Sequence, residues 1–275
     1  MADGSPAAKT ISSEMSESAP YVVTITLAKE PVNSMSLEFW RELEQEVQAA
    51  HENPKVRAIL FQSGLKKNVF TAGLDLKELV PGITTRERQR DFWATMTRTL
   101  ALIYGTSKTT VALVNGACPA GGCGLSLCCD LRFITADGSM GLNEVQIGLP
   151  VPEYWIKLMV RVIGERNAEK ILVPGIISKV PELVKMNMVD AVVEKREDLK
   201  AAATAKLQKD FLKLPPPTYK LMKDIFRAEF AKEWHDNRDR EGSLVWEAIN
   251  QPSTKKFLQG VMAQLSGKAK GKAKL

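Results

Sequence analysis

The sequence predicts an α/β fold with parallel strands, followed by a largely helical C-terminal part. Short, β-branched apolar runs recur between residues 21 and 135, and segments with helical spacing of apolar residues separate them. Strands that are apolar throughout are typical of sheets covered on both faces, and the strand–helix alternation favours parallel pairing. After Pro150 the helical patterns dominate, so we expect an α/β core over 20–195 and a helical region over 196–266.

The elements expected in the core follow from periodicity and from the residues that bound each segment. Tyr21–Leu27 is β-branched and lies between prolines, and residues 36–51 show helical spacing with Ser34 or Ser36 as the N-cap. In chain order we expect strands at 21–27, 56–62, 109–114 and 131–135, and helices at 36–51, at the end of 66–79, at 86–104 and after Gly122.

Beyond Pro150 the pattern predicts a series of helices and one last strand. The expected helices are 154–163, 168–172, 181–186, 199–212 and 218–230, and the expected strand is 189–193. The prolines at 215–217 should interrupt the helical tail. Helical appendages with exposed apolar faces often pack on a partner subunit, so we expect an oligomer.

The N-terminal segment, residues 1–19, is polar and rich in serine and alanine, and we expect it to be flexible. It lacks the apolar centre of a secretory signal, and its acids and lack of arginine argue against a mitochondrial transit peptide. No apolar run reaches the ~18 residues needed to cross a bilayer, so we expect no membrane association.

The four cysteines, Cys118, Cys123, Cys128 and Cys129, lie in one short apolar segment whose spacing matches no zinc pattern. We expect them to be small buried side chains in a reducing compartment. The chain has only two histidines, and neither has a partner at helical spacing. No metal site is therefore expected, and a carboxylate is the expected general base.

The formal net charge is +6, and part of the excess lies in the basic tail GKAKGKAKL at 267–275. Its last residues, Ala273-Lys274-Leu275, have the small–basic–leucine form of the C-terminal peroxisomal address. We therefore expect binding to a peroxisomal import receptor and a location in a peroxisome or similar organelle, with the mitochondrial matrix as the alternative.

Three segments are candidates for one site. FTAGLDLKEL, residues 70–79, follows a strand and a loop, and by itself reads as a turn. NGACPAGGCGLSLCCD, residues 115–130, places Gly121-Gly122 where a strand gives way to a helix. Backbone N–H groups at such a turn can bind an anion or a developing oxyanion. GLNEVQIG, residues 141–148, holds Glu144 among apolar residues; it is either a solvent-facing edge residue or a buried base with a raised pKa.

These three motifs, in this order and spacing, resemble the crotonase (enoyl-CoA hydratase/isomerase) superfamily, and within it the Δ3,Δ2-enoyl-CoA isomerases. The similarity covers about residues 21–193. It implies a spiral of ββα turns with a C-terminal helical oligomerisation region, a homotrimer or hexamer, an acyl-CoA thioester substrate, and no cofactor beyond the CoA of that substrate.

The resemblance also assigns residues one at a time. The two oxyanion-hole N–H groups fall on Leu74 and Gly121, and the catalytic acid on Glu144. The second glutamate of the hydratases falls on Gly124, so it is absent. The family implies that Ala72, Gly73, Asp75 and Leu76 line the CoA channel beside Leu74 and Gly121, and that Asn143 supports the acyl pocket.

The implied function is the shift of a 3-cis or 3-trans double bond to 2-trans in the β-oxidation of unsaturated fatty acids. Moving a double bond needs one group that takes and returns a proton, whereas hydration needs two acids. The related isomerases carry a bulky apolar residue at position 124, so Gly124 is expected to leave room there for water or a larger acyl chain.

Other readings stay open at this stage. Lys66 and Lys67 either pair with CoA phosphates or are simply solvated. A hydratase or a dienoyl-CoA isomerase would share the fold but expects an acid near Gly124. An RNA-binding protein of this fold would need a basic stripe with interleaved aromatics, which the lysine-rich tail lacks, so no nucleic acid is expected.

Overall fold

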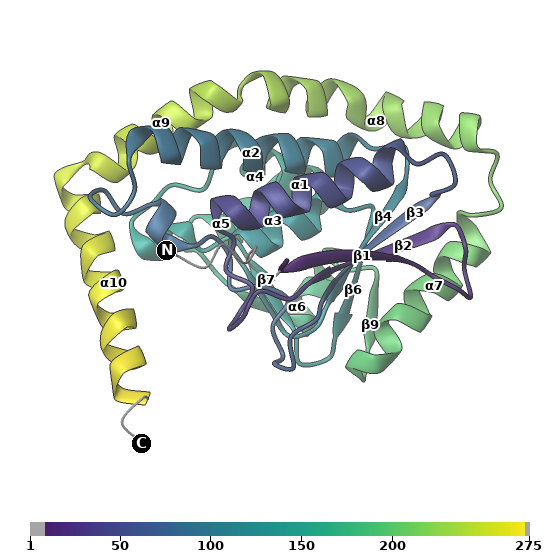
Figure 1. Cartoon of the computed structure of the whole chain (residues 1–275), viewed down its shortest axis with the longest axis horizontal. Helices are drawn as coiled ribbons and strands as arrows, with labels where there is room; N and C mark the ends of the chain where they lie inside the picture. The colour runs from purple at the N-terminus through teal and green to yellow at the C-terminus, as the bar shows by residue number, and fades with distance from the viewer. Residues whose placement is uncertain (1–8, 273–275) are drawn as a thin grey trace, which may run out of the picture.

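The computed structural model describes residues 9–272 and has an α/β core covered by helices (Figure 1). The larger sheet has six strands in the order β1-β2-β3-β4-β6-β9, and a second sheet has the order β5-β7-β8. The strands are β1 (Ile11–Met15), β2 (Val22–Leu27), β3 (Ala58–Ser63), β4 (Thr109–Val114), β5 (Ala117–Pro119), β6 (Leu131–Thr135), β7 (Ser139–Gly141), β8 (Ser178–Lys179) and β9 (Ala191–Val193). The predicted fold class is confirmed.

The helices lie between these strands and then make up the C-terminal part. They are α1 (Leu37–Glu52), α2 (Arg86–Gly105), α3 (Gly121–Cys128), α4 (Glu153–Ile163), α5 (Glu165–Leu172), α6 (Val180–Lys185), α7 (Leu199–Asp210), α8 (Pro216–Asp236), α9 (Arg238–Asn250) and α10 (Pro252–Lys272). Short 3-10 helices η1 (Leu76–Glu78), η2 (Glu144–Ile147) and η3 (Arg196–Asp198) join some of them.

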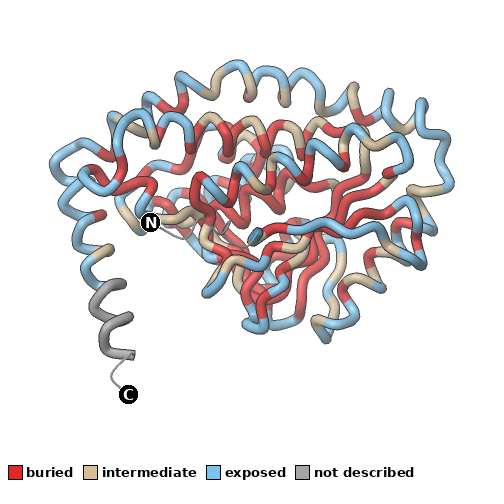
Figure 2. The backbone as a smooth tube through the Cα atoms, in the orientation of Figure 1, coloured by how far each residue is buried: buried red, intermediate tan, exposed pale blue. Residues whose placement is uncertain are grey.

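The central sheet is buried on both faces, as its apolar strands predicted. Strands β2, β3, β4, β6 and β9 pair in parallel. Successive side chains of β3 alternate between two cores: Ile59 and Phe61 pack with α1 and α2, whereas Leu60 packs with α7. The tube coloured by burial shows the central strands and the inner sides of α1 and α2 largely in red, whereas edge strand β1 is mostly pale blue (Figure 2).

The N-terminal segment differs from the prediction, because residues 11–15 have regular secondary structure. They form edge strand β1, which pairs antiparallel to β2 with Ile11 opposite Leu27. The side chain of Glu42 on α1 accepts hydrogen bonds from the N–H groups of Thr10 and Ile11 at 2.8 and 2.9 Å. Only Ile11 of this strand is buried, so the sequence carried no alternating pattern that would reveal it.

The C-terminal helices follow the prediction in outline. The helical tail is interrupted near the predicted prolines: α7 ends at Asp210, Pro215 is the N-cap of α8, and Pro216 and Pro217 are the first residues of α8. Helix α8 is held to the core by Asp130, which accepts hydrogen bonds from Lys223 Nζ (2.6 Å) and from the Thr110 N–H (2.7 Å). Helix α10 leaves the body of the molecule (Figure 1). None of the described helices is long and apolar enough to cross a membrane.

Candidate active site

The three candidate segments meet in the folded chain. The Phe70 N–H donates to the Ala117 carbonyl at 2.9 Å, which joins the first segment to the second. The Ala120 N–H donates to the Gly141 carbonyl at 2.8 Å, which joins the second to the third. The loop before η1, the N-terminus of α3 and the start of η2 are therefore neighbours, as the hypothesis of a single site required.

The loop from Ala72 to Leu76 is held by backbone pairing with the segment before α1. Gly73 accepts from the Met35 N–H, and the Asp75 N–H donates to the Met35 carbonyl, both at 3.0 Å. Gly73 has φ +88°, a conformation that favours glycine. Between these two bonds, the N–H of Leu74 donates to no acceptor among the described residues. The loop thus presents one unpaired backbone donor.

Asn33, which the sequence analysis did not single out, holds this loop in place through hydrogen bonds to backbone carbonyls. Its buried side-chain amide donates to the carbonyls of Leu27 and Phe70 at 3.1 and 2.9 Å. Thr71 in turn donates its hydroxyl to the Asn33 carbonyl at 2.7 Å and accepts the Gly73 N–H at 3.0 Å. An amide that bonds across two turns leaves no pattern in the sequence.

The C-terminal end of the loop is held by η1 and by the buried acid Glu78. Asp75 caps η1 by accepting the Lys77 N–H at 3.1 Å, and Leu76 is the first residue of that helix. Glu78 is 2% exposed, and its carboxylate accepts the Leu37 N–H at 3.0 Å and the Arg88 Nε–H at 2.9 Å. Helices α1 and α2 therefore set the position of the loop.

The N-terminus of α3 lies against Leu74. A Cβ added to Gly121 would come within 2.7 Å of the Leu74 side chain, so glycine is what allows this approach. Ala120 before it has φ +48°, a strained conformation for a residue with a side chain. The N–H of Gly121, at the positive end of α3, donates to no acceptor among the described residues. A second unpaired donor thus lies next to the first.

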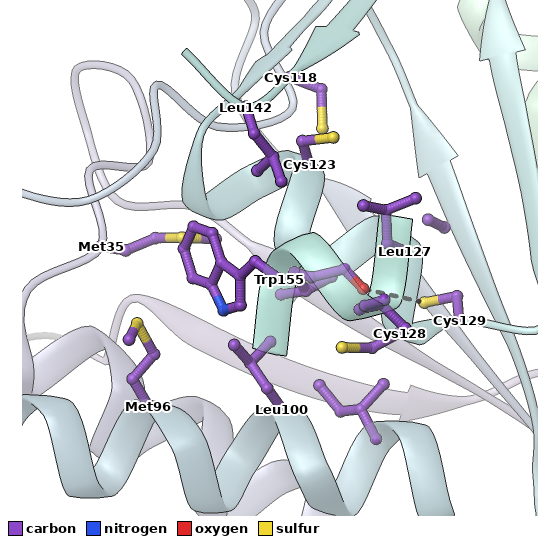
Figure 3. Packing of buried hydrophobic residues seen from close by; sticks show 14 of the residues in the cluster. Met35, Met96, Leu100, Cys118, Cys123, Leu127, Cys128, Cys129, Leu142 and Trp155 are labelled. Carbon is purple, nitrogen blue, oxygen red and sulfur yellow. Dashed lines mark hydrogen bonds between the residues drawn. The ribbon is translucent and has the colours of Figure 1, made fainter. Parts of the chain in front are cut away.

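The four cysteines are buried and free within the described residues, as expected. They lie on or next to α3, which contains Cys123 and Cys128. Figure 3 shows Cys118 and Cys123 near Leu142, and Cys128 and Cys129 near Leu127. Burial raises the pKa of the Cys118 thiol to about 12, so it is protonated at neutral pH. These side chains fill space around the helix that carries Gly121.

Glu144, at the start of η2, is 6% exposed and is not a solvent-facing strand residue. Neither of its carboxylate oxygens has a hydrogen-bond partner among the described residues. Burial raises its pKa to about 7. A carboxylate without partners whose pKa lies near neutrality is suited to taking up a proton and giving it back.

Glu144 and Leu74 line the same small apolar cavity, which has a volume of about 20 Å³. Its other walls come from the end of η1, from α2, from the segment after η2, and from α4 and α9. They are Leu79, Trp93, Leu149, Pro150, Pro152, Trp155, Val245 and Ala248. Among these residues Glu144 alone carries a carboxylate. The tryptophans and the α9 residues were not predicted as site residues, because apolar residues on helices read as core.

Residues 17–268 match the family model described as enoyl-CoA hydratase/isomerase. The chain belongs to the enoyl-CoA hydratase/isomerase family. It is 30% identical over 247 residues to the human protein named "Enoyl-CoA delta isomerase 1, mitochondrial", covering 89% of this chain and 80% of the relative. The rat protein of the same name is 30% identical over 242 residues, covering 86% of this chain and 81% of the relative.

Solved structures agree with this assignment. The crystal structure of human mitochondrial delta3-delta2-enoyl-CoA isomerase matches with a TM-score of 0.87 and 28% identity, covering 94% of this chain and 99% of that one. An enoyl-CoA hydratase from Bacillus halodurans matches with a TM-score of 0.83 and 20% identity, covering 91% and 99%. The second match shows the shared fold.

In this family member, Gly124 does not leave the room expected from the sequence. A Cβ at that position would meet three indole atoms of Trp155 at 3.2–3.3 Å. Trp155 is fully buried and occupies the space that a side chain at 124 would take. The expectation of an enlarged pocket at Gly124 was wrong, because a residue 31 positions later fills it from α4.

Of the predicted site residues, Leu74 and Glu144 line this cavity. The others do not: Ala72, Gly73, Asp75, Leu76, Gly121 and Asn143. Asn143 precedes η2, but its side chain makes no capping hydrogen bond and does not line the cavity. Ala72 is exposed, and its N–H donates to the Val32 carbonyl at 2.9 Å. Lys67 is bonded to the Pro31 carbonyl at 3.1 Å, near the same loop.

Proposed function

We propose that the protein is a Δ3,Δ2-enoyl-CoA isomerase that converts 3-enoyl-CoA thioesters to the 2-trans isomers, in the β-oxidation of unsaturated fatty acids. The observation that carries this is a single buried carboxylate, Glu144, in a cavity beside two unpaired backbone N–H groups. The enzyme class, an isomerase, is shown by the relatives named above. The specific reaction is our inference.

In the proposed mechanism, the thioester oxygen accepts hydrogen bonds from the N–H groups of Leu74 and Gly121. Glu144 removes a proton from C2, which is acidic because it is both α to the thioester and allylic. The C–H electron pair forms a double bond between C1 and C2, and the carbonyl pair moves to the oxygen. The result is a dienolate that is conjugated with the C3–C4 double bond and carries its charge largely on the oxygen. Glu144 then delivers the same proton to C4, and the double bond ends between C2 and C3.

The site's electrostatics suit this sequence of steps. Each backbone donor to a developing oxyanion is typically worth about 3 kcal/mol of transition-state stabilisation. The Gly121 donor also lies at the N-terminus of α3, whose dipole favours negative charge. Because no described side chain is bonded to Glu144, its carboxylate is free to move between C2 and C4. The reaction proposed uses no cofactor, since CoA is part of the substrate.

Hydration is the alternative reaction within the same family, and the residues that line the cavity disfavour it. Adding water needs one group to activate the water and another to deliver a proton. Glu144 is the one carboxylate among the residues that line the described cavity, and the position next to Trp155 is Gly124. An RNA-binding protein would need a basic surface with aromatic side chains, and the mostly apolar walls of this cavity do not provide one.

We place the CoA moiety along the loop from Ala72 to Leu76, as the family resemblance implies. Lys29 supports this region, because its ammonium group donates to the Ser34 carbonyl and to the Ser36 hydroxyl, both at 2.8 Å. Lys66 is exposed beside the same loop, where it can meet phosphate groups of a bound CoA.

A homo-oligomer, a trimer or a hexamer, is part of the proposal. Helix α8 leaves a row of large apolar side chains in solvent, including Ile225 at 67% and Phe226 at 70% exposure. Leu221 and Met222, one turn earlier, continue this row. Contiguous exposed apolar faces of this kind usually mark a protein contact. Size measurement in solution tests this part.

For location, the curated relatives favour the mitochondrial matrix, which the sequence analysis held as the alternative to a peroxisome. The human, mouse and rat relatives all carry "mitochondrial" in their names. The candidate peroxisomal address Ala273-Lys274-Leu275 lies outside the described residues. A fluorescent fusion with and without this tripeptide distinguishes the two compartments.

The function is tested by incubating the purified protein with 3-cis- and 3-trans-enoyl-CoA and separating the products. We expect the 2-trans-enoyl-CoA from both. In a second reaction, starting from 2-trans-enoyl-CoA, we expect little 3-hydroxyacyl-CoA. Efficient hydration together with absent isomerisation would replace the proposal by the hydratase reading.

A further inference from the structure

The cavity beside Glu144 is small for an acyl chain. Its volume of about 20 Å³ is only slightly above the ~10–15 Å³ that a cavity needs, on the same measure, to hold one water molecule. If C2 and C4 of the substrate lie at Glu144, the carbons beyond C4 must enter this cavity or displace one of its walls. The wall that a longer chain must displace therefore decides how long a chain can bind.

Two tryptophan side chains form the largest walls of the cavity. The first, Trp93 on α2, is held in place by a hydrogen bond and by close packing on α9. Its indole N–H donates to the Glu241 carboxylate at 3.2 Å, and Glu241 also accepts the Tyr154 N–H at 3.3 Å. Gly242 lies so close to Trp93 that an added Cβ would stand 3.3 Å from the tryptophan Cβ. These contacts join helices α2, α4 and α9. Trp93 is therefore a fixed wall, and a bound acyl chain of any length meets it in the same position.

The second large wall, Trp155 on α4, is held by shape alone. It is fully buried, yet its indole nitrogen has no hydrogen-bond partner among the described residues. Three atoms around the ring junction lie almost equally far, 3.2–3.3 Å, from the position of a Cβ at Gly124. The face of the indole thus rests on Gly124. In Figure 3 the ring lies among Met35, Met96 and Leu142.

We propose that Trp155, resting on Gly124, sets the acyl-chain length of this enzyme and restricts it to short-chain 3-enoyl-CoA substrates. The inference rests on the isomerase function proposed above. A chain with few carbons beyond C4 fits beside the indole, whereas a longer one requires the ring to leave its position. Gly124 matters because any larger residue would push the indole away from α3.

The test compares wild type with Trp155→Phe on hexenoyl-, decenoyl- and tetradecenoyl-CoA, each with the double bond at C3. For wild type we expect kcat/KM to fall about tenfold or more from hexenoyl to decenoyl, a usual size for pocket discrimination. In Trp155→Phe the smaller ring should reduce that ratio about tenfold. Trp40→Phe is the matched control, because Trp40 is equally buried with an unpartnered nitrogen but does not line the cavity.

Gly124→Ala tests the same contact from the other side and keeps the inference falsifiable if Trp155→Phe folds poorly. The added methyl should displace the indole and steepen the fall of kcat/KM with chain length. Equal kcat/KM of wild type for hexenoyl and decenoyl substrates would overturn the inference, as would a folded Trp155→Phe with the wild-type ratio.

A binding measurement separates this inference from the isomerase proposal. Calorimetry with saturated hexanoyl- and dodecanoyl-CoA needs no turnover. If wild type isomerises no substrate but binds hexanoyl-CoA more tightly, and Trp155→Phe removes that difference, the function proposal fails and the chain-length assignment stands. If isomerisation is present and neither variant changes the chain-length profile, only the assignment fails.

Discussion

The Thr71 methyl group lies 2.3 Å from the position that a Cβ on Gly122 would occupy. The loop that presents Leu74 and the helix that presents Gly121 therefore touch at a point where only glycine fits. The Thr71 hydroxyl, on the same side chain, bonds to both Asn33 and Gly73. The spacing of the two backbone donors depends on this contact.

Gly122→Ala should lower the free energy of unfolding by about 1–3 kcal/mol, the usual range for an overpacked core site. Adding Thr71→Ser should restore much of that loss, because serine lacks the clashing methyl and keeps the hydroxyl. Denaturant unfolding checks both variants. Gly260→Ala on α10 meets nothing within 4 Å and should instead stabilise by about 0.5–1 kcal/mol. Equal effects of the two glycine substitutions would contradict the steric account.

Glu144→Gln should lower kcat by about 10²- to 10⁴-fold, because an amide cannot take the C2 proton. Binding of a saturated acyl-CoA, measured by calorimetry, should stay within a few-fold of wild type, since the side chain keeps its shape. Glu153→Gln, at an exposed acid on α4, is the control and should leave kcat unchanged. Wild-type turnover by Glu144→Gln would remove the proposed base.

Activity should rise with pH through neutrality. Because burial raises the pKa of Glu144 to about 7, the free enzyme holds the base protonated below that pH and ionised above it. We expect kcat/KM to increase tenfold per pH unit on the acid side and to level off above about 7. A profile that is flat between pH 5 and 8 would show that another group takes the proton.

The same ionisation should affect stability in the opposite direction. The pKa of Glu144 is higher in the folded chain, about 7, than its ordinary value of 4.5. The favourable contribution of the protonated form is thus complete below pH 4.5 and is lost as pH rises to 7, a change of about 3 kcal/mol. Glu144→Gln should therefore raise the melting temperature at pH 8 and have little effect at pH 4.5. A variant less stable than wild type at pH 8 would refute this.

Asp130→Asn should destabilise the protein by about 3–5 kcal/mol, because the buried Lys223 would lose its counter-charge. Burial already lowers the pKa of Lys223, which shows how unfavourable its charge is there. Asp224→Asn, at an exposed pair with Lys220 on the same helix, is the matched control and should change stability by less than about 1 kcal/mol. Urea unfolding compares the two, and equal values would contradict the ion-pair account.

Local pattern was enough to predict most of the core elements. Thr109–Val114 and Leu131–Thr135 are strands with the predicted ends, and the long helix predicted at 86–104 is α2, Arg86–Gly105. These segments are long, apolar and periodic, so their local preference and their burial agree. Strand β1 was missed because its pairing with β2 and its bonds to Glu42 come from elsewhere in the chain.

The sequence by itself determined the family motifs, the glycine turn and the presence of one glutamate in an apolar stretch, since each lies within a few consecutive residues. Only the tertiary structure decided that Glu144 is buried without a partner and that Leu74 lies against Gly121. It also placed Trp155 in the space beside Gly124. These relationships join side chains from α3, α4, η2 and distant loops, and packing between elements far apart in the chain leaves no local signal.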